Sequence, residues 1–145
     1  TLHRAENTDD LSRLARLLAY VTANAEGRRV VFPVHPRTRA VLARSGIAAT
    51  GLELIDPVGY VDMHRLLAGA HEVLTDSCGL QKEAYFHRVP CITLREETEW
   101  VETIAAGWNR LWSVGDYAPR REISEFGDGN AAGRIVACIA AWLDR

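Results

Sequence analysis

Several features that would assign this sequence of 145 residues to a common class of protein are missing from it. Charge of one sign does not dominate, since 17 Lys and Arg residues face 19 Asp and Glu residues and leave a formal net charge of -2. This balance gives no reason to expect nucleic acid or an anionic membrane surface as a partner. No apolar run approaches the length of a membrane span, and we therefore expect no membrane partner.

Cysteine is also scarce, and its three positions form neither an even set suited to disulfides nor the spacing of metal ligands: Cys78, Cys91 and Cys138. We expect these thiols to be reduced and the protein to be cytoplasmic. His64, His71 and Cys78 are evenly spaced, but they run through a predicted helix, turn and strand and do not converge. Neither a P-loop nor a Gly-x-Ser-x-Gly turn occurs, and we expect no metal and no other cofactor.

Patterns typical of helices and of strands alternate along the chain. Apolar residues at helical spacing run through residues 9–26, with Thr8 or Asp9 as the expected cap. Further helices are expected at residues 36–45, 60–70, 81–86, 99–106 and 131–143, and strands at 30–34, 52–55, 72–76, 91–94 and 109–114. This alternation predicts one α/β domain over residues 1–145, a doubly wound parallel sheet covered by helices on both faces.

The most informative segment is Val73–Ala84, which has the pattern of a buried strand, a short polar turn and the start of a helix. Such a turn directs free backbone N–H groups and the positive end of a helix dipole at one point, which suits a phosphate. Ser77 can cap the helix or donate a hydrogen bond to an oxyanion, and Gly79 lets a ligand approach the backbone. Glu83 returns to the same helix face, where its carboxylate can accept both hydroxyls of a ribose.

The same segment also has a purely structural interpretation, in which Ser77 is an ordinary helix cap and Glu83 a solvated surface residue. The topology favours a site, because ligands of doubly wound sheets bind beyond the carboxyl ends of the strands. His3, His35 and Arg95 each follow a predicted strand and are expected at that edge, beside the turn at residues 76–79. The sequence therefore predicts a nucleotide site there.

Three blocks of the sequence, in this order, resemble a known family: Leu2–Asn7, Val73–Ala84 and Pro90–Thr103. They are similar to the C-terminal half of the non-hydrolysing UDP-N-acetylglucosamine 2-epimerases. The resemblance extends to Val34-His35-Pro36, to Ile55-Asp56-Pro57 with Tyr60, and to Gly127-Asp128-Gly129, so that it covers nearly the whole chain. It implies a Rossmann-like domain, the C-terminal domain of a glycosyltransferase-B-like fold.

The resemblance also implies an activity for the full-length protein. Members of the family interconvert UDP-GlcNAc and UDP-ManNAc, by eliminating UDP and adding it back after C2 has been reprotonated on the other face. The acidic residues that exchange the C2 proton lie in the N-terminal domain of these enzymes, and no counterpart is in this sequence. The part that remains is the half that holds UDP, and we expect it to be inactive alone.

Because the resemblance begins partway into the family's domain, we expect this chain to be a fragment whose N-terminal domain is absent. Thr1 and Leu2 have the position of the last two residues of a first strand. In a doubly wound sheet that strand lies centrally, so its loss leaves unpaired edges and apolar surface. The missing N-terminal domain is thus an expected partner, together with the UDP-sugar substrate, and the full-length protein is a possible homodimer.

The resemblance assigns roles to residues at two of the predicted turns. His3 is the expected catalytic residue and Arg4 its partner, a pair that neutralises the diphosphate as the bond to the sugar breaks. Ser77, the backbone of Cys78 and Gly79 correspond to the phosphate turn.

Four further residues complete the expected binding site. Glu83 corresponds to the ribose carboxylate, and Arg95 lies in a loop that closes on the substrate and contacts the sugar or a phosphate. His35 is a cleft residue, which in some bacterial relatives lies by a second, regulatory UDP-GlcNAc. Met63 occupies a position near the uracil that is often aromatic, and Glu6 either orients Arg4 or belongs to the first helix cap.

Besides Met63, the sequence departs from the family at two further points of the site. Cys78 replaces the first glycine of the usual Ser-Gly-Gly turn, where its β-carbon would be strained if the backbone needed a positive φ, and Lys82 replaces an acid beside the ribose glutamate. Two other functions consequently remain open. One is a hydrolysing relative that releases UDP and free ManNAc, and the other is a UDP-binding module without catalysis.

Overall fold

The computed structural model describes residues 1–143 and confirms an α/β fold with parallel strands. In chain order the elements are α1 (Ala5–Thr8), α2 (Leu11–Asn24), β1 (Val30–Pro33), α3 (Pro36–Ser45), β2 (Leu52–Ile55), α4 (Tyr60–Ala68), β3 (Val73–Thr75), α5 (Cys78–Phe86), β4 (Cys91–Thr93), α6 (Val101–Ala105), β5 (Asn109–Leu111), the 3₁₀ helix η1 (Ser124–Phe126) and α7 (Ala131–Leu143). Every helix and strand predicted from the sequence is present, with shifted boundaries at several ends.

Two of the shifts have clear physical reasons. Helix α2 is capped by Asp10, whose side chain accepts hydrogen bonds from the backbone N–H groups of Ser12 and Arg13, so the prediction of Thr8 or Asp9 as the cap was wrong. Thr8 instead ends the separate helix α1. Helix α5 begins at Cys78, three residues before the predicted start, so the turn after β3 is shorter than expected.

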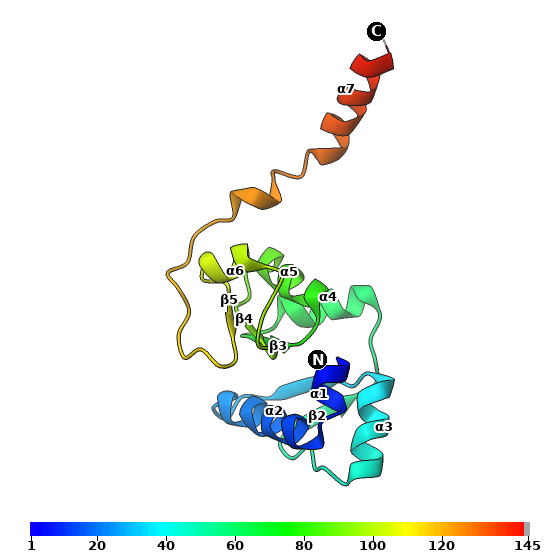
Figure 1. The fold of residues 1–145 in the computed structure, drawn as a ribbon, viewed down its shortest axis with the longest axis vertical. Helices are drawn as coiled ribbons and strands as arrows, with labels where there is room; N and C mark the ends of the chain where they lie inside the picture. Colours follow the sequence, from blue (N-terminus) through cyan, green and yellow to red (C-terminus); the bar gives the residue numbers. More distant parts are fainter. Residues whose placement is uncertain (144–145) are drawn as a thin grey trace.

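All the strand pairs are parallel, and they fall into two groups. Strand β1 pairs with β2, and β3, β4 and β5 form a second sheet in that order. Figure 1 shows α2 and α3 beside the first pair and α4, α5 and α6 around the second group. Each consecutive pair of strands in a sheet is joined through a helix, as parallel pairing requires.

The start of the chain lies between the two sheets. The Thr1 ammonium donates to the Leu74 carbonyl over 2.9 Å, and the Asp76 N–H donates to the Thr1 carbonyl over 3.3 Å. Thr38 Oγ1 donates to the Leu2 carbonyl, and Leu2 is buried. These two residues therefore occupy one end of a strand position between β1 and β3.

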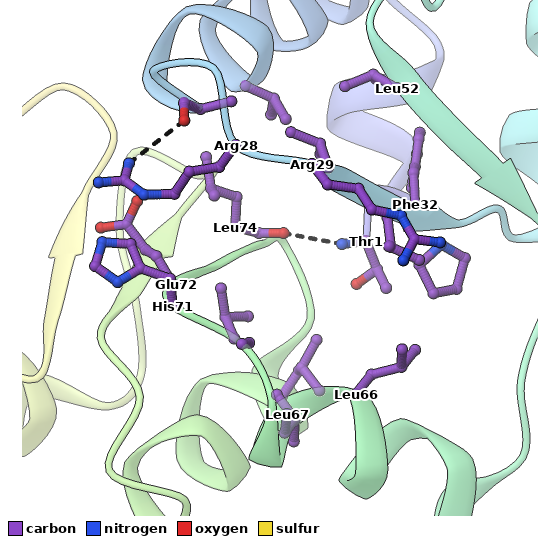
Figure 2. Close-up of a pocket in the computed structure, with 18 of the residues that line it drawn as sticks. Thr1, Arg28, Arg29, Phe32, Leu52, Leu66, Leu67, His71, Glu72 and Leu74 are labelled. Carbon is purple, nitrogen blue, oxygen red and sulfur yellow. Dashed lines mark hydrogen bonds between the residues drawn. The ribbon is translucent and has the colours of Figure 1, made fainter.

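Beyond Thr1 this strand position is a cavity of about 490 Å³. Figure 2 shows Phe32 and Leu52 on one side of it and Leu66, Leu67 and Leu74 on the other. Apart from Thr1 and Leu2, no segment of residues 1–143 pairs with the inner edges of β1 and β3. The expected unpaired edges and apolar surface are thus present.

The core is formed mainly by α2 and the strands. Leu14, Leu17, Leu18 and Val21 of α2 are buried together with apolar residues of four other segments: Leu2, Phe32, Val34, Val41, Ile92 and Leu94. A second cluster packs α4 and α5 against β3 and β4: Leu67, Val73, Leu80, Ala84, Val89 and Cys91. Residues at the carboxyl ends of both β1 and β3 line one cavity, which is described below.

Helix α7 lies outside this core. Figure 1 shows it projecting from the rest of the chain, and all its side chains are exposed, including five large apolar ones: Ile135, Val136, Ile139, Trp142 and Leu143. Among the described residues, no helix has both the length and the apolar character needed to cross a membrane.

Candidate functional site

A cavity of about 310 Å³ opens at the carboxyl ends of β1 and β3. Six of the nine residues that the sequence predicted for the site line it: His3, His35, Met63, Ser77, Gly79 and Glu83. They come from the start of the chain and from the segments around β1, α4 and α5. Pro57, Val58 and Tyr60 complete the wall on the side of α4.

The turn between β3 and α5 consists of Asp76 and Ser77 and leads directly into the helix. Ser77 occupies the cap position with extended backbone (φ -78°, ψ 129°), but its side chain makes no capping hydrogen bond. Its N–H is held by Thr75 Oγ1 at 3.0 Å, which fixes the turn. Ser77 is thus the cap residue of α5, as one of the two interpretations held, but it does not cap through its side chain. Its hydroxyl can therefore donate to a ligand beside the first N–H groups of α5.

Gly79 and Glu83 share one face of α5, as their spacing predicted. A β-carbon built on Gly79 would lie 3.8 Å from Glu83 Oε1, so the carboxylate reaches back over the first turn of the helix. Both residues line the cavity, and Glu83 is half-buried. The carboxylate is thus available to a neutral, hydroxyl-bearing group bound next to the turn.

His3 lies between a carboxylate and another imidazole. Its Nδ1 is 3.2 Å from Asp76 Oδ1, and its ring centroid is 5.2 Å from that of His35 at an interplanar angle of 30°. Burial lowers the pKa of His3 most, and the nearby His35, Arg4 and Thr1 ammonium lower it further, while Asp76 raises it. The balance favours a neutral ring facing the cavity.

Arg4 is bound to the turn between β3 and α5. Its Nε donates to the Asp76 carbonyl over 3.0 Å, and its Nη2 lies 2.6 Å from Cys78 Sγ. The thiol in turn lies 3.3 Å from Glu99 Oε2 and 3.8 Å from Arg95 Nη1. The predicted cation is therefore in place beside the turn, with part of its guanidinium directed at the thiol of Cys78.

Arg95 is buried, with only 6% of its surface exposed, and it is surrounded by acids. Its Nη1 donates to both carboxylate oxygens of Glu99, at 3.0 and 2.9 Å, and this hydrogen bonding is the largest cause that lowers the pKa of Glu99 to about 2. Its Nε lies 3.2 Å from Glu6 Oε1. Glu6 thus neither orients Arg4 nor caps a helix, in contrast to both alternatives, but pairs with Arg95.

His35 and Met63 reach the cavity from different elements. His35 Nδ1 accepts the N–H of Arg37 over 3.1 Å and so caps α3, which leaves its other ring nitrogen for the cavity. Met63 lies on α4, where it packs against the apolar cluster that contains Leu67. A flexible thioether at this point can adapt to a flat ring.

Cys78 fits the turn without backbone strain. It is the first residue of α5, and the only non-glycine residues with positive φ among residues 1–143 are Glu26 and Arg88. The Cys78 carbonyl accepts a hydrogen bond from Trp100 Nε1 at 2.8 Å, which links the turn to the segment before α6. The departure from Ser-Gly-Gly consequently changes what surrounds Arg4 rather than the path of the chain.

Sequence reasoning did not assign a role to Asp76 or Trp100. The carboxylate of Asp76 is fully buried and accepts the N–H groups of His3 and Arg4. The only signal in the sequence was its place at the end of a buried strand. No group of three or more His, Cys, Asp or Glu side chains within the described part of the chain is placed to hold a metal ion.

The parallel α/β architecture, with a cavity at the carboxyl ends of β1 and β3 on either side of the Thr1–Leu2 segment, defines a Rossmann-like domain. The sequence profile of the family "UDP-N-acetylglucosamine 2-epimerase" matches residues 1–140. The chain belongs to this family.

Similar proteins come from archaea and bacteria. A UDP-N-acetylglucosamine 2-epimerase homolog of Methanococcus maripaludis is 42% identical over 96% of this chain and 43% of its own length. The UDP-2,3-diacetamido-2,3-dideoxy-D-glucuronate 2-epimerase of Pseudomonas aeruginosa is 50% identical over 77% of this chain and 31% of its own. The chain therefore spans less than half the length of the curated relatives it matches.

Solved structures show the same fold. The UDP-GlcNAc 2-epimerase of Methanocaldococcus jannaschii superposes with a TM-score of 0.81 at 34% identity, over 97% of this chain and 44% of the other. The same enzyme has been crystallised in complex with UDP-GlcNAc and UDP, and it matches equally well in that state. These neighbours confirm the predicted glycosyltransferase-B-like, Rossmann-like class.

Proposed function

We propose that this chain is the UDP-sugar-binding half of an epimerase that interconverts UDP-GlcNAc and UDP-ManNAc by inverting C2. The observation that carries the proposal is the 310 Å³ cavity, because it gathers His3, Ser77, Gly79 and Glu83 from segments more than 70 positions apart in the sequence. The family membership supports the same function, as does the neighbouring structure in complex with UDP-GlcNAc and UDP.

Each part of the nucleotide has a group of matching chemistry. The first N–H groups of α5, the Ser77 hydroxyl and Arg4 suit the diphosphate. Glu83 suits the ribose hydroxyls, and Met63 lies where a base would meet the wall of α4. His3, at the edge of the same cavity, would stabilise the pyrophosphate as its bond to C1 breaks. Arg95 lies beside the thiol of Cys78 and forms ion pairs with Glu6 and Glu99. It would contact the ligand directly only if these ion pairs broke.

We further propose that the active protein includes an N-terminal domain that supplies the acids for proton transfer at C2. The empty strand position between β1 and β3 and the exposed apolar residues of α7 support a larger protein, because both leave apolar surface uncovered. A homodimer and a cytoplasmic location belong to the same proposal, and the three free thiols are compatible with that location.

A second candidate substrate follows from the comparison with Pseudomonas aeruginosa. That relative is named as a 2-epimerase of UDP-2,3-diacetamido-2,3-dideoxy-D-glucuronate. It is 50% identical to this chain over 112 residues, compared with 42% over 156 residues for the Methanococcus maripaludis homolog. Both substrates have the same UDP and the same reacting C2, so the site described above would serve either. The sugar's carboxylate would have to be recognised by other residues, and a hydrolysing reaction remains a third outcome.

The test of the nucleotide site is a calorimetric titration of the chain with UDP, with ADP for comparison. We expect selective binding of UDP, and a loss of affinity of roughly 10- to 100-fold in Glu83→Gln, because a hydrogen bond to a charged group contributes about 1.5–3 kcal/mol. Glu97→Gln is the matched control, since Glu97 is exposed and does not line the cavity. Equal binding of ADP, or no binding of UDP by the folded chain, would contradict the proposal.

The reaction is tested on the full-length protein by NMR of the products. UDP-ManNAc formed from UDP-GlcNAc supports epimerisation, and free ManNAc with UDP supports hydrolysis instead. Turnover of UDP-2,3-diacetamido-2,3-dideoxy-D-glucuronate with no reaction of UDP-GlcNAc would establish the second candidate.

A further inference from the structure

The carboxylate of Asp76 is the most heavily hydrogen-bonded acid near the cavity. It is fully buried, and Oδ2 accepts the backbone N–H groups of His3 at 2.9 Å and Arg4 at 2.8 Å, and the side-chain amide of Asn7 at 3.0 Å. Oδ1 accepts the same His3 N–H at 3.1 Å and lies 3.2 Å from His3 Nδ1. A carboxylate with this many donors around it is held in one position.

We propose that Asp76 is the positioning residue of His3, which holds the imidazole by Nδ1 and so presents Nε2 to the cavity. The role given to His3 in the reaction rests on the proposed function, whereas the arrangement of the two side chains does not. Asp76 thus contacts both the backbone N–H and the ring of His3.

The arrangement determines where the proton of a neutral His3 lies. A carboxylate only accepts hydrogen bonds, so the ring nitrogen that faces Asp76 must be the one with the proton. Nε2 is then unprotonated in the neutral ring and is the atom that gains a proton when the ring becomes cationic. An added proton at Nε2 can be donated to a leaving phosphate oxygen, and the same nitrogen can take it back when UDP returns.

The charges around His3 show what Asp76 contributes. Three cationic or ionisable groups face the ring besides Asp76: His35, Arg4 and the Thr1 ammonium. All three lower the pKa of His3, as burial does, and only Asp76 raises it. Without this carboxylate the cationic form of His3, which is the form that can donate a proton, would be suppressed.

The test is an NMR pH titration of the imidazole nitrogens of the chain, with the His3 signals assigned by their loss in His3→Gln. In the unchanged chain we expect the neutral His3 ring to have its proton on Nδ1. In Asp76→Asn we expect the pKa of His3 to fall by about one unit or more, because an opposite charge within about 4–6 Å shifts a pKa by that amount.

Asn7→Ala is the matched control, because it removes one hydrogen bond from the same carboxylate and leaves the charge beside His3. A similar pKa shift in both variants, or no shift in a folded Asp76→Asn chain, would overturn the proposal. If Asp76→Asn does not fold, the unchanged chain decides the question: a proton on Nε2 of neutral His3 overturns it, and a proton on Nδ1 supports it. UDP binding is measured separately, so its failure would refute the proposed function and not the arrangement of Asp76 and His3.

Discussion

The thiol of Cys78 lies at the centre of the charged groups of the site. It approaches Arg4 Nη2 at 2.6 Å and is also within reach of Arg95 and Glu99. A glycine at this position would leave the same two guanidinium groups without a sulfur between them. The identity of this one side chain therefore decides how much of Arg4 is available to a phosphate.

We expect Cys78→Gly to bind UDP about tenfold more tightly, because one donor of Arg4 becomes free for a charge-assisted hydrogen bond worth about 1.5 kcal/mol or more. The same change should cost at most about 1 kcal/mol of stability, as glycine is a poor helix former. Calorimetry and urea unfolding measure the two effects. Cys78→Ser keeps a hydrogen-bond acceptor for Arg4 and should change the affinity little; an equal gain in that variant would refute the explanation.

Individual residues also show where sequence reasoning succeeded and where it failed. Ser77, Gly79 and Glu83 were predictable because their relation is local, within two turns of one helix. The pairing of Glu6 with Arg95 was not predictable, because the two residues are 89 positions apart and meet only when α1 docks against the loop after β4. Asp76 was expected at the same edge of the sheet, but its contacts were not predictable for the same reason, since its partners His3, Arg4 and Asn7 lie near the start of the chain.

At the scale of elements, the turn after α6 is the most constrained. Gly107 has a φ of +69°, and a β-carbon there would lie 2.1 Å from the Ala118 carbonyl oxygen. The loop that approaches it is fixed further by Arg121, whose N–H donates to the Ala106 carbonyl over 3.0 Å. Close contact of two backbones at this point requires a residue without a side chain.

We expect Gly107→Ala to destabilise the chain by about 2–4 kcal/mol, through the positive φ and the clash with Ala118 together. Gly46→Ala is the matched control, because Gly46 also has a φ of +69° but a β-carbon added there would have no other atom within 4 Å. Its cost should be about 1 kcal/mol, the backbone contribution alone. Urea unfolding compares the two, and equal losses would show that the contact with Ala118 is unimportant.

The order of the elements was predictable because hydrophobic periodicity is a local property, and Pro36–Ser45 and Ala131–Leu143 were predicted to the residue. The start of α5 was not, because its first turn, Cys78-Gly79-Leu80, has neither a side-chain cap nor an apolar stripe. The cap of α2 was also not predictable from the sequence, because two aspartates are adjacent there. Asp9 is the C-cap residue of α1 and pairs with Arg37, and Asp10 is the one that accepts the free N–H groups of α2.

At the scale of the whole molecule, the sheet is interrupted in its middle. Strands β1 and β3 face each other across the 490 Å³ cavity, and Thr1 and Leu2 fill one end of it. With a strand in this position the order would be β2, β1, the added strand, β3, β4 and β5, which is the order of a doubly wound sheet.

We expect four apolar, β-branched residues added before Thr1, such as Val-Ile-Val-Val, to raise Tm by about 4–8 °C. This corresponds to an increase of about 2 kcal/mol in the free energy of unfolding, because the added strand buries apolar side chains and forms hydrogen bonds with both β1 and β3. An extension of Gly-Ser-Gly-Ser is the control, since it has no apolar side chains to bury. Thermal unfolding followed by circular dichroism measures the difference. The same Tm with both extensions would mean that the cavity does not accept a strand.

The contacts of Asp76 also have a consequence for the order in which the protein is assembled during synthesis. They join residues 3, 4 and 7 to a position 69–73 residues later, so the 310 Å³ cavity cannot form on the ribosome until β3 has emerged. A ligand of this cavity would thus bind only chains in which these long-range contacts have formed, and it would stabilise those chains against unfolding by mass action. Addition of UDP during refolding should increase the yield of native chains without accelerating the early steps.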